Sequence, residues 1–284
     1  MPAETPDYLM LPDGSRLAYH ATPARQSDDA TPGVVFLGGF MSDMTGDKAT
    51  SLEAWARRTG RAYLRLDYSG HGRSDGAFRD GTLGRWLDDA ARIVIHCGTT
   101  VAGLSGPLVL VGSSMGGWLM VRLAQRLAAA GGTQRVAGLV GIAAAPDFTE
   151  DLLPERLGAA VMAAVMRDGI VEMPTPYSDR PYTITRRLIE EARDHLLLRG
   201  PVALDLPVRL LHGTADRDVP WRQSQKLMAV LTGDDVTLTL VKDGDHRLST
   251  PRDLERLRRT VATLCDEIAA KAQPSVSSAA SPAR

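Results

Sequence analysis

The chain has 284 residues, of which 44% are hydrophobic and 24% charged, with a net charge of −1. This length suits one large domain or two small ones. The near-neutral charge argues against a protein that binds nucleic acid or a membrane surface through charge. The two cysteines, Cys97 and Cys265, lie far apart and belong to no Cys/His cluster. This favours buried thiols in a reducing compartment over a disulfide or a metal site.

The first ten residues, MPAETPDYLM, contain no basic region followed by an apolar core. We therefore predict no secretion signal and a cytoplasmic location. No apolar run approaches the length needed to span a membrane, so no integral membrane association is expected.

Strand-like and helix-like segments alternate along most of the chain. A hairpin is predicted around Asp13-Gly14. Apolar runs predict strands over 33–37, 62–67, 108–111, 136–142, 208–212 and 236–241, those over 33–37 and 108–111 being typical of buried strands. Helical spacing predicts helices over 47–59, 82–101, 118–127, 221–231 and 251–271. This alternation predicts the α/β class, with a mostly parallel sheet covered by helices on both faces.

The alternation breaks at Pro146. Residues 146–201 contain several prolines and no clear strand, with helical patterns over 154–167 and 183–198. We predict a helical cap over the carboxyl edge of the sheet, the alternative being an extended crossover with no covering role. The predicted domains are a core of 1–145 and 202–272, a cap of 146–201, and a disordered tail of 273–284 that is rich in Ser, Ala and Pro.

Residues 107–120, PLVLVGSSMGGWLM, join an apolar strand to a helix through the pattern Gly-x-Ser-x-Gly. In this context the pattern predicts a nucleophile elbow, which presents the Ser114 hydroxyl at the carboxyl end of the strand. Gly112, Gly116 and Gly117 leave room for backbones to pass closely. A glycine-rich turn with an incidental serine is the alternative, and the partners of Ser114 decide between the two.

A serine hydroxyl needs a base to become a strong nucleophile. Among six histidines, His246 lies in Asp243-Gly244-Asp245-His246-Arg247, after the last strand and before the last helix. That position is on the same sheet edge as Ser114. His212 ends a strand, and His71 lies in a Gly-His-Gly loop that could line the base of the site; for both, a structural role is the more economical interpretation.

The base in turn needs an acid, and Leu211-His212-Gly213-Thr214-Ala215-Asp216-Arg217-Asp218 supplies one after another strand. Asp216 is the first choice and Asp218 the second. The resulting order of serine, aspartate and histidine is that of the α/β-hydrolases. An oxyanion hole is expected from the backbone N–H groups of Met115, which follows the nucleophile, and of Phe40 in Gly38-Gly39-Phe40.

Several stretches resemble the α/β-hydrolase family that includes the mitochondrial acyl-glucuronide esterase and protein depalmitoylase of animals. They lie within 67–76 (DYSGHGRSDG), 82–86 (TLGRW), 111–120 (VGSSMGGWLM), 209–221 (RLLHGTADRDVPW) and 245–247 (DHR). The resemblance extends from Asp7 to about Lys271. It implies a serine hydrolase that acts on acyl esters or thioesters, with Ser114, Asp216 and His246 as its triad.

The sequence therefore predicts a serine hydrolase that needs no cofactor or metal and cleaves a small-molecule or acylated-protein substrate through an acyl-enzyme, with acyl-protein thioesterase activity as one form. The alternatives are a small-molecule carboxylesterase of the acyl-glucuronide type and a non-catalytic binding protein on the same fold. Apolar residues of the first cap helix are candidates for an acyl pocket, or else attach the cap to the sheet: Leu157, Met162, Val165 and Met166.

Overall fold

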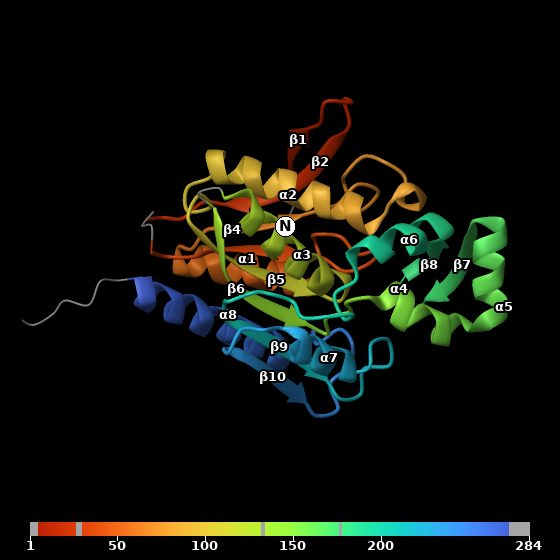
Figure 1. The fold of residues 1–284 in the computed structure, drawn as a ribbon. Coiled ribbons are helices and arrows are strands. Elements are labelled where there is room, and N and C mark those ends of the chain that lie inside the picture. Colours follow the sequence, from red (N-terminus) through yellow and green to blue (C-terminus); the bar gives the residue numbers. More distant parts are fainter. Residues whose placement is uncertain (1–4, 27–29, 132–133, 176–177, 273–284) are drawn as a thin grey trace, which may run out of the picture.

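A computed structural model of the chain describes residues 5–26, 30–131, 134–175 and 178–272. It contains a central sheet with helices on both faces and a smaller group of elements beyond the carboxyl ends of the strands (Figure 1). The predicted α/β class, with a mostly parallel sheet flanked by helices, is confirmed. The predicted tail, 273–284, lies outside the described residues.

The sheet has eight strands in the spatial order β1-β2-β4-β3-β5-β6-β9-β10. The strands β1 and β2 form an antiparallel hairpin, β2 pairs antiparallel with β4, and the remaining pairs are parallel. Their bounds are β1 Asp7–Met10, β2 Arg16–Thr22, β3 Gly33–Leu37, β4 Tyr63–Leu66, β5 Pro107–Ser113, β6 Arg135–Ile142, β9 Val208–Gly213 and β10 Val236–Val241. Strands β3, β4 and β5 are buried along their whole length, which explains their unbroken apolar sequences.

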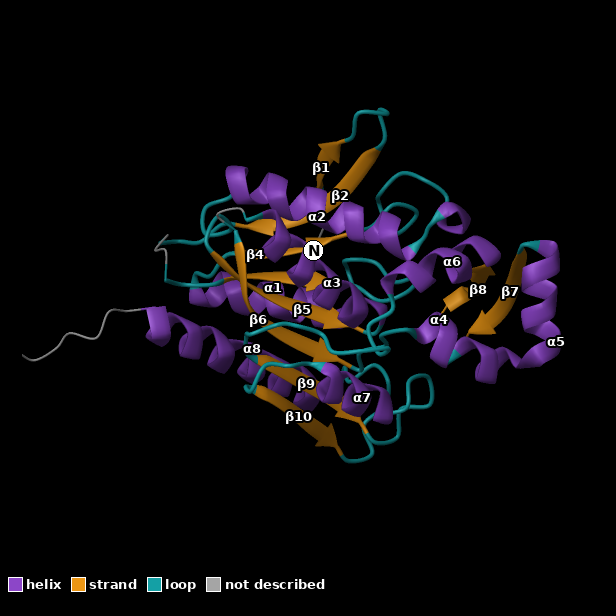
Figure 2. Ribbon diagram, in the orientation of Figure 1, coloured by secondary structure: helices purple, strands orange, loops and turns teal. Residues whose placement is uncertain are grey.

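The helices divide between the two faces of the sheet (Figure 2). On one face lie α1 (Asp47–Thr59) and α8 (Pro251–Ala272), whose apolar residues share a core cluster with Val109 and Val140. The other face is covered by α2 (Leu83–Thr100), α3 (Met115–Ala130) and α7 (Arg222–Val230).

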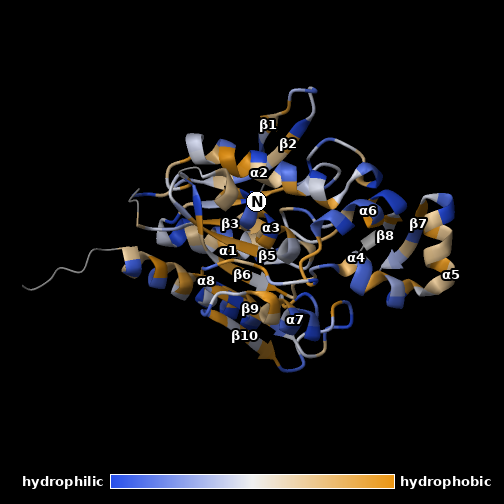
Figure 3. Cartoon of the chain, in the orientation of Figure 1, coloured by the Kyte–Doolittle hydropathy of each residue, from blue (hydrophilic) through white to orange (hydrophobic). Residues whose placement is uncertain are grey.

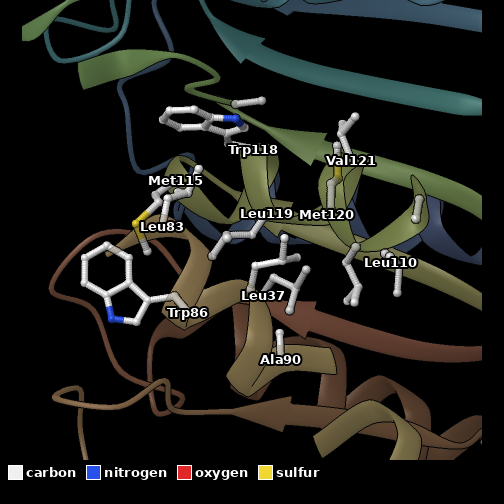
Figure 4. Close-up of a cluster of buried hydrophobic side chains, with 14 of the residues drawn as sticks. Leu37, Leu83, Trp86, Ala90, Leu110, Met115, Trp118, Leu119, Met120 and Val121 are labelled. Carbon is white, nitrogen blue, oxygen red and sulfur yellow. The ribbon is translucent and has the colours of Figure 1, made fainter. Parts of the chain in front are cut away.

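Helix α3 is the most deeply buried of these helices. Trp118, Leu119, Met120 and Val121 are all inaccessible to solvent, and they pack with residues of α2, β3 and β5 (Figure 4). Colouring by hydropathy shows the same arrangement, with the strands between the helices largely apolar (Figure 3). This packing fixes the position of the first turn of α3, and therefore the position of Ser114, which precedes the helix.

Residues 146–201, which we call the insertion, lie between β6 and β9. The first long helix, α5, was predicted and is present, with a kink at Gly158, where φ is +74°. The prediction of no strand was wrong. The helix predicted over 183–198 is present but shorter, over Arg186–Ala192, and a 3₁₀ turn continues it to His195. The insertion contains α4 (Phe148–Asp151), α5 (Leu153–Asp168), an antiparallel pair β7 (Ile170–Thr175) and β8 (Ser178–Thr185), α6 (Arg186–Ala192) and a 3₁₀ turn (Arg193–His195). A second 3₁₀ turn, Phe78–Asp80, precedes α2.

The helix α6 begins at Arg186, and not at residue 183 as predicted, because Thr185 acts as its N-cap. The Thr185 hydroxyl accepts a hydrogen bond from the N–H of Leu188, and the preceding residues extend as β8. The Pro-containing β7 and β8 form a two-stranded ribbon, in which each strand has a free edge that tolerates proline.

The two ends of the insertion meet at Asp147. Its carboxylate is fully buried and accepts hydrogen bonds from the N–H groups of Leu197 and Leu198, at 2.7 and 2.8 Å. Burial raises the pKa of Asp147 above its ordinary value. A side chain at the start of the insertion thus holds the backbone at its end, and this closes the base of the insertion beside α7, where Gln223 donates to the Pro146 carbonyl.

Candidate active site

Ser114 lies in the turn between β5 and α3, with φ +54° and ψ −120°. A non-glycine residue seldom adopts this backbone conformation, which costs of order 1–3 kcal/mol. The flanking glycines make the turn sterically possible. A Cβ on Gly116 would lie 2.1 Å from the carbonyl oxygen of Leu37, and one on Gly112 would lie 2.2 Å from the carbonyl oxygen of Gly116. The strained turn places the Ser114 hydroxyl at the carboxyl edge of the sheet.

Three predicted residues come together at this edge from three different loops. The Ser114 hydroxyl lies 3.1 Å from Nε2 of His246, and Nδ1 of His246 lies 2.8 Å from Oδ2 of Asp216. With Nδ1 donating its proton to the carboxylate, Nε2 is free to accept from the serine hydroxyl. A chain of hydrogen bonds therefore connects a hydroxyl, an imidazole and a carboxylate in the geometry that a catalytic triad requires.

The carboxylate of Asp216 is fully buried and accepts further hydrogen bonds. Its Oδ1 accepts from the N–H groups of Asp218 and Val219, each at 2.9 Å. Burial acts to raise the pKa of Asp216, but the hydrogen bonds from His212 and His246 and the charge of His246 outweigh it. The pKa therefore lies well below its ordinary value, so that this group stays a carboxylate and can stabilise an imidazolium at His246.

His212 also contacts the carboxylate of Asp216. Its Nε2 lies 3.1 Å from Oδ2 of Asp216 and 2.9 Å from the carbonyl oxygen of Val219, and its Nδ1 lies 2.7 Å from the Ser224 hydroxyl. Two acceptors around Nε2 require a proton there, so Nδ1 accepts from the serine. The sequence predicted a structural role for His212 but not the group that it contacts. The spacing of four residues between His212 and Asp216 could have indicated this contact.

The predicted oxyanion residues also reach the site. Phe40 and Met115 line the cavity around Ser114. Gly39 lies close to the nucleophile, since a Cβ on it would be 3.3 Å from Cβ of Ser114. The aromatic ring of Phe40 packs against four other aromatic rings, with centroids 4.9 to 6.0 Å apart, which fixes the loop that carries its N–H: Phe78, Trp86, Phe148 and Tyr182.

His71 supports the same loop. It is buried, its Nε2 accepts a hydrogen bond from the N–H of Met41 at 3.3 Å, and its Nδ1 lies 3.3 Å from the carbonyl oxygen of Ser69. Met41 follows Phe40 and has a φ of +55°. Burial lowers the pKa of His71 to about 4, so the ring is neutral near pH 7 and can accept from Met41. His71 therefore lines the base of the site and holds a strained loop in place.

The site opens into a cavity of about 710 Å³ between the sheet edge and the insertion. Its walls differ in character. The insertion supplies mostly apolar side chains, together with Arg156, while the residues after β3 and around His246 supply mostly polar and charged ones beside Phe40 and Met41. The apolar wall includes Leu152, Leu153, Leu157, Met173, Tyr182 and Ile184, and the polar wall includes Ser42, Asp43, Asp47, Lys48, Arg247 and Ser249.

Only one of the four candidates for the acyl pocket lies where it was expected. Leu157 lines the cavity, whereas Val165 is fully buried and Met162 packs against the main core cluster. Met166 is not among the lining residues. The kink at Gly158 separates Leu157 from these three residues, which all lie on the part of α5 that follows it.

The second-choice acid, Asp218, has a different environment from Asp216. Its carboxylate forms an ion pair with Arg156 of α5, at 2.9 Å. Asp216, Asp218 and His246 offer ligand atoms within 4.8 Å of one another, a spacing that also suits a metal ion. However, both ring nitrogens of His246 are engaged, by Ser114 and by Asp216, which matches proton transfer rather than metal binding.

The model of the alpha/beta hydrolase family matches residues 34–259. The chain belongs to this family. It is therefore a hydrolase, and the resemblance drawn from its sequence is confirmed. The "palmitoyl-protein thioesterase ABHD10, mitochondrial" of Bos taurus is 36% identical over 262 residues, which cover 92% of this chain and 80% of that protein. Its Homo sapiens counterpart is 35% identical with the same coverage.

Solved structures agree with this assignment. A putative hydrolase from Agrobacterium vitis S4 is 40% identical, with a TM-score of 0.84 over 92% of this chain and 100% of that one. Alpha/beta hydrolase domain-containing protein 10 from mouse is 34% identical, with a TM-score of 0.78 over 93% of this chain and 100% of that one.

The prediction of a cytoplasmic location is contradicted by the relatives, whose names all place them in mitochondria. That prediction rested only on the composition of the first ten residues of the sequence. In the part of the chain that the structure describes, no helix has the length and apolar character to cross a membrane.

Proposed function

We propose that this chain is a serine hydrolase that cleaves acyl esters or thioesters through an acyl-enzyme, with Ser114 as nucleophile. The observation that carries the proposal is the continuous hydrogen-bond chain from Ser114 through His246 to Asp216. The names of the relatives, palmitoyl-protein thioesterases, support a thioester of a long-chain acid as one substrate class.

In the proposed reaction, His246 takes the Ser114 proton on Nε2 while Oγ bonds to the acyl carbon. The carbonyl electrons move to the oxygen, which the N–H groups of Phe40 and Met115 stabilise. As the carbonyl re-forms, the bond to the leaving oxygen or sulfur breaks and that atom receives the proton from His246. His246 then takes a proton from a water molecule, whose oxygen bonds to the acyl carbon. The bond between that carbon and Oγ of Ser114 breaks, the acid is released, and His246 returns the proton to Oγ.

Two features support an acyl chain as the group that stays on the enzyme. The cavity wall formed by the insertion is mostly apolar, and it faces the same space as Ser114. The volume of about 710 Å³ lies within the range of small-molecule sites. Of the alternatives, a carboxylesterase without thioesterase activity uses the same machinery and differs only in the leaving atom.

The proposal is tested with a fluorophosphonate probe and with octanoyl p-nitrophenyl ester beside an octanoyl thioester. We expect stoichiometric labelling of the wild-type protein and turnover of both substrates. Ser114→Ala should abolish labelling and lower turnover by several powers of ten. A folded wild-type protein that is neither labelled nor active would leave the binding-protein alternative. Activity on the ester alone would favour the carboxylesterase.

A further inference from the structure

The polar wall of the cavity contains a cation that the triad does not use. Lys48 is the second residue of α1, is half-buried and lines the cavity. Its ammonium donates a short hydrogen bond to the backbone carbonyl of Arg247, the residue that follows His246. The side chain of Lys48 therefore reaches from the first turn of α1 to the backbone beside His246.

This ammonium has no close anionic partner. Within the described part of the chain, no carboxylate oxygen lies within 4.0 Å of its Nζ. The carboxylates that act on it from farther away are engaged elsewhere: Asp47 pairs with Arg247 at 3.2 Å, Asp245 accepts from the N–H of Leu248 at 2.9 Å, and Asp216 belongs to the triad. An ammonium has three N–H donors, so Lys48 keeps donors for a ligand.

Partial burial makes the protonated form of Lys48 less stable. Burial, and then the charge of Arg247, lower the pKa of Lys48 to about 8. The group is still mostly protonated at pH 7. A half-buried cation without an ion pair has lost hydration that no close anion replaces, so an anion placed beside it recovers part of that loss.

Lys48 lies on the side of the site from which the leaving group departs. His246 must hand its proton to the leaving oxygen or sulfur, so that atom lies beside His246. The apolar wall is formed by the insertion, whereas Lys48 and Arg247 lie on the polar wall next to the base. The acyl chain and the leaving group therefore meet walls of opposite character.

We propose that Lys48 binds a carboxylate or phosphate carried by the leaving group of the substrate. This inference rests on the proposed acyl hydrolase activity and narrows its substrates to acyl esters or thioesters of acidic alcohols or thiols. Lys48 is a specificity-determining residue in this assignment, and Arg247 positions its ammonium through the backbone carbonyl.

The test uses three octanoyl thioesters that differ only in the leaving thiol: neutral 3-mercaptopropionamide, 3-mercaptopropionate and 2-mercaptoethyl phosphate. The values of kcat/KM are measured at pH 7.0 by thiol release. We expect wild-type protein to prefer an anionic thiol by about 10-fold, the scale of one charged hydrogen bond. The carboxylate and phosphate arms identify which anion fits.

Lys48→Met should reduce this preference to near 1, and Lys48→Arg should retain it because the cation remains. Lys271→Met is the matched control, since it removes the same charge at the end of α8, outside the cavity lining, and should keep the wild-type ratio. Equal preference in wild type overturns the inference. So does an equal loss of kcat/KM on all three substrates in Lys48→Met, which would mean that Lys48 only holds the Arg247 carbonyl.

A binding measurement separates this inference from the proposed function. The non-hydrolysable ligands 3-(octylthio)propionate and its amide are titrated by calorimetry into wild type and Lys48→Met. A carboxylate preference in wild type that the variant loses supports the subsite, whether or not thioesters are turned over. Equal binding of both ligands, or no binding, overturns it. The proposed hydrolase activity fails separately, by lack of turnover of the neutral thioester.

Discussion

Two aspartates that follow the same strand have different environments. Asp216 accepts four hydrogen bonds, one of them from His246, whereas Asp218 forms an ion pair with Arg156, whose side chain is 43% exposed. We expect Asp216→Asn to lower kcat by about 10⁴, because an amide no longer selects the productive His246 tautomer. Asp218→Asn should change kcat only a few-fold, since exposed ion pairs contribute at most about 1 kcal/mol. Hydrolysis of octanoyl p-nitrophenyl ester measures both, and a reversed result would move the acid to Asp218.

His71 makes the stability of the protein depend on pH. Burial lowers the pKa of His71 to about 4 in the folded state, below the ordinary value of 6.5. The unfolded chain therefore takes up a proton first as the pH falls, and the stabilisation present above pH 6.5 is lost between pH 6.5 and 4. We expect the unfolding free energy of wild type to fall by as much as about 3 kcal/mol more than that of His71→Gln over this range. Urea unfolding at pH 7, 6, 5 and 4 checks this, and parallel pH profiles would contradict it.

At the scale of the element, the nucleophile elbow depends on the space around its glycines. A Cβ on Gly116 would overlap the carbonyl of Leu37 in β3, which continues into the loop that carries Phe40. We expect Gly116→Ala to lower the unfolding free energy by at least about 1–3 kcal/mol and to lower kcat, because β3 and the oxyanion loop must move apart from α3. Gly200→Ala is the control, since a Cβ there meets no atom within 4 Å. Equal stabilities of the two variants in urea would contradict this account.

Elements buried on both faces were predictable from the sequence, and those of the insertion were less so. The strand β5 has an unbroken apolar sequence because both of its faces are covered, and the loops that carry Ser114, Asp216 and His246 follow from strand order. The strand β7 is half-exposed, and β7 and β8 each contain a proline, so the hydrophobic alternation in their sequences is weak. The side-chain directions of α5 also escaped prediction, because the kink at Gly158 breaks the helical period. Lys48 gave no signal, since a lysine in the first turn of a helix is unremarkable until its surroundings are known.

At the scale of the whole molecule, the cavity exists only because the insertion lies over the sheet edge (Figure 1). Its walls come from segments far apart in the sequence. The ion pair between Arg156 and Asp218 joins α5 to the loop that carries the acid, and Asp147 closes the base of the insertion. The position of the insertion therefore determines both the shape of the apolar wall and the surroundings of Ser114, Asp216 and His246.

The apolar wall leads to an expectation about chain length. Each methylene that leaves water is worth about 0.8 kcal/mol, or about fourfold in kcat/KM. We expect kcat/KM on p-nitrophenyl esters to rise from acetyl to octanoyl. Leu157→Ala should lower the ratio of octanoyl to acetyl rates, because Leu157 lines the cavity, whereas Ile170→Ala, which changes an exposed residue of β7 outside the lining, should keep the wild-type ratio. If kcat/KM of the wild type stays constant or falls as the acyl chain lengthens, the acyl chain does not bind along the insertion.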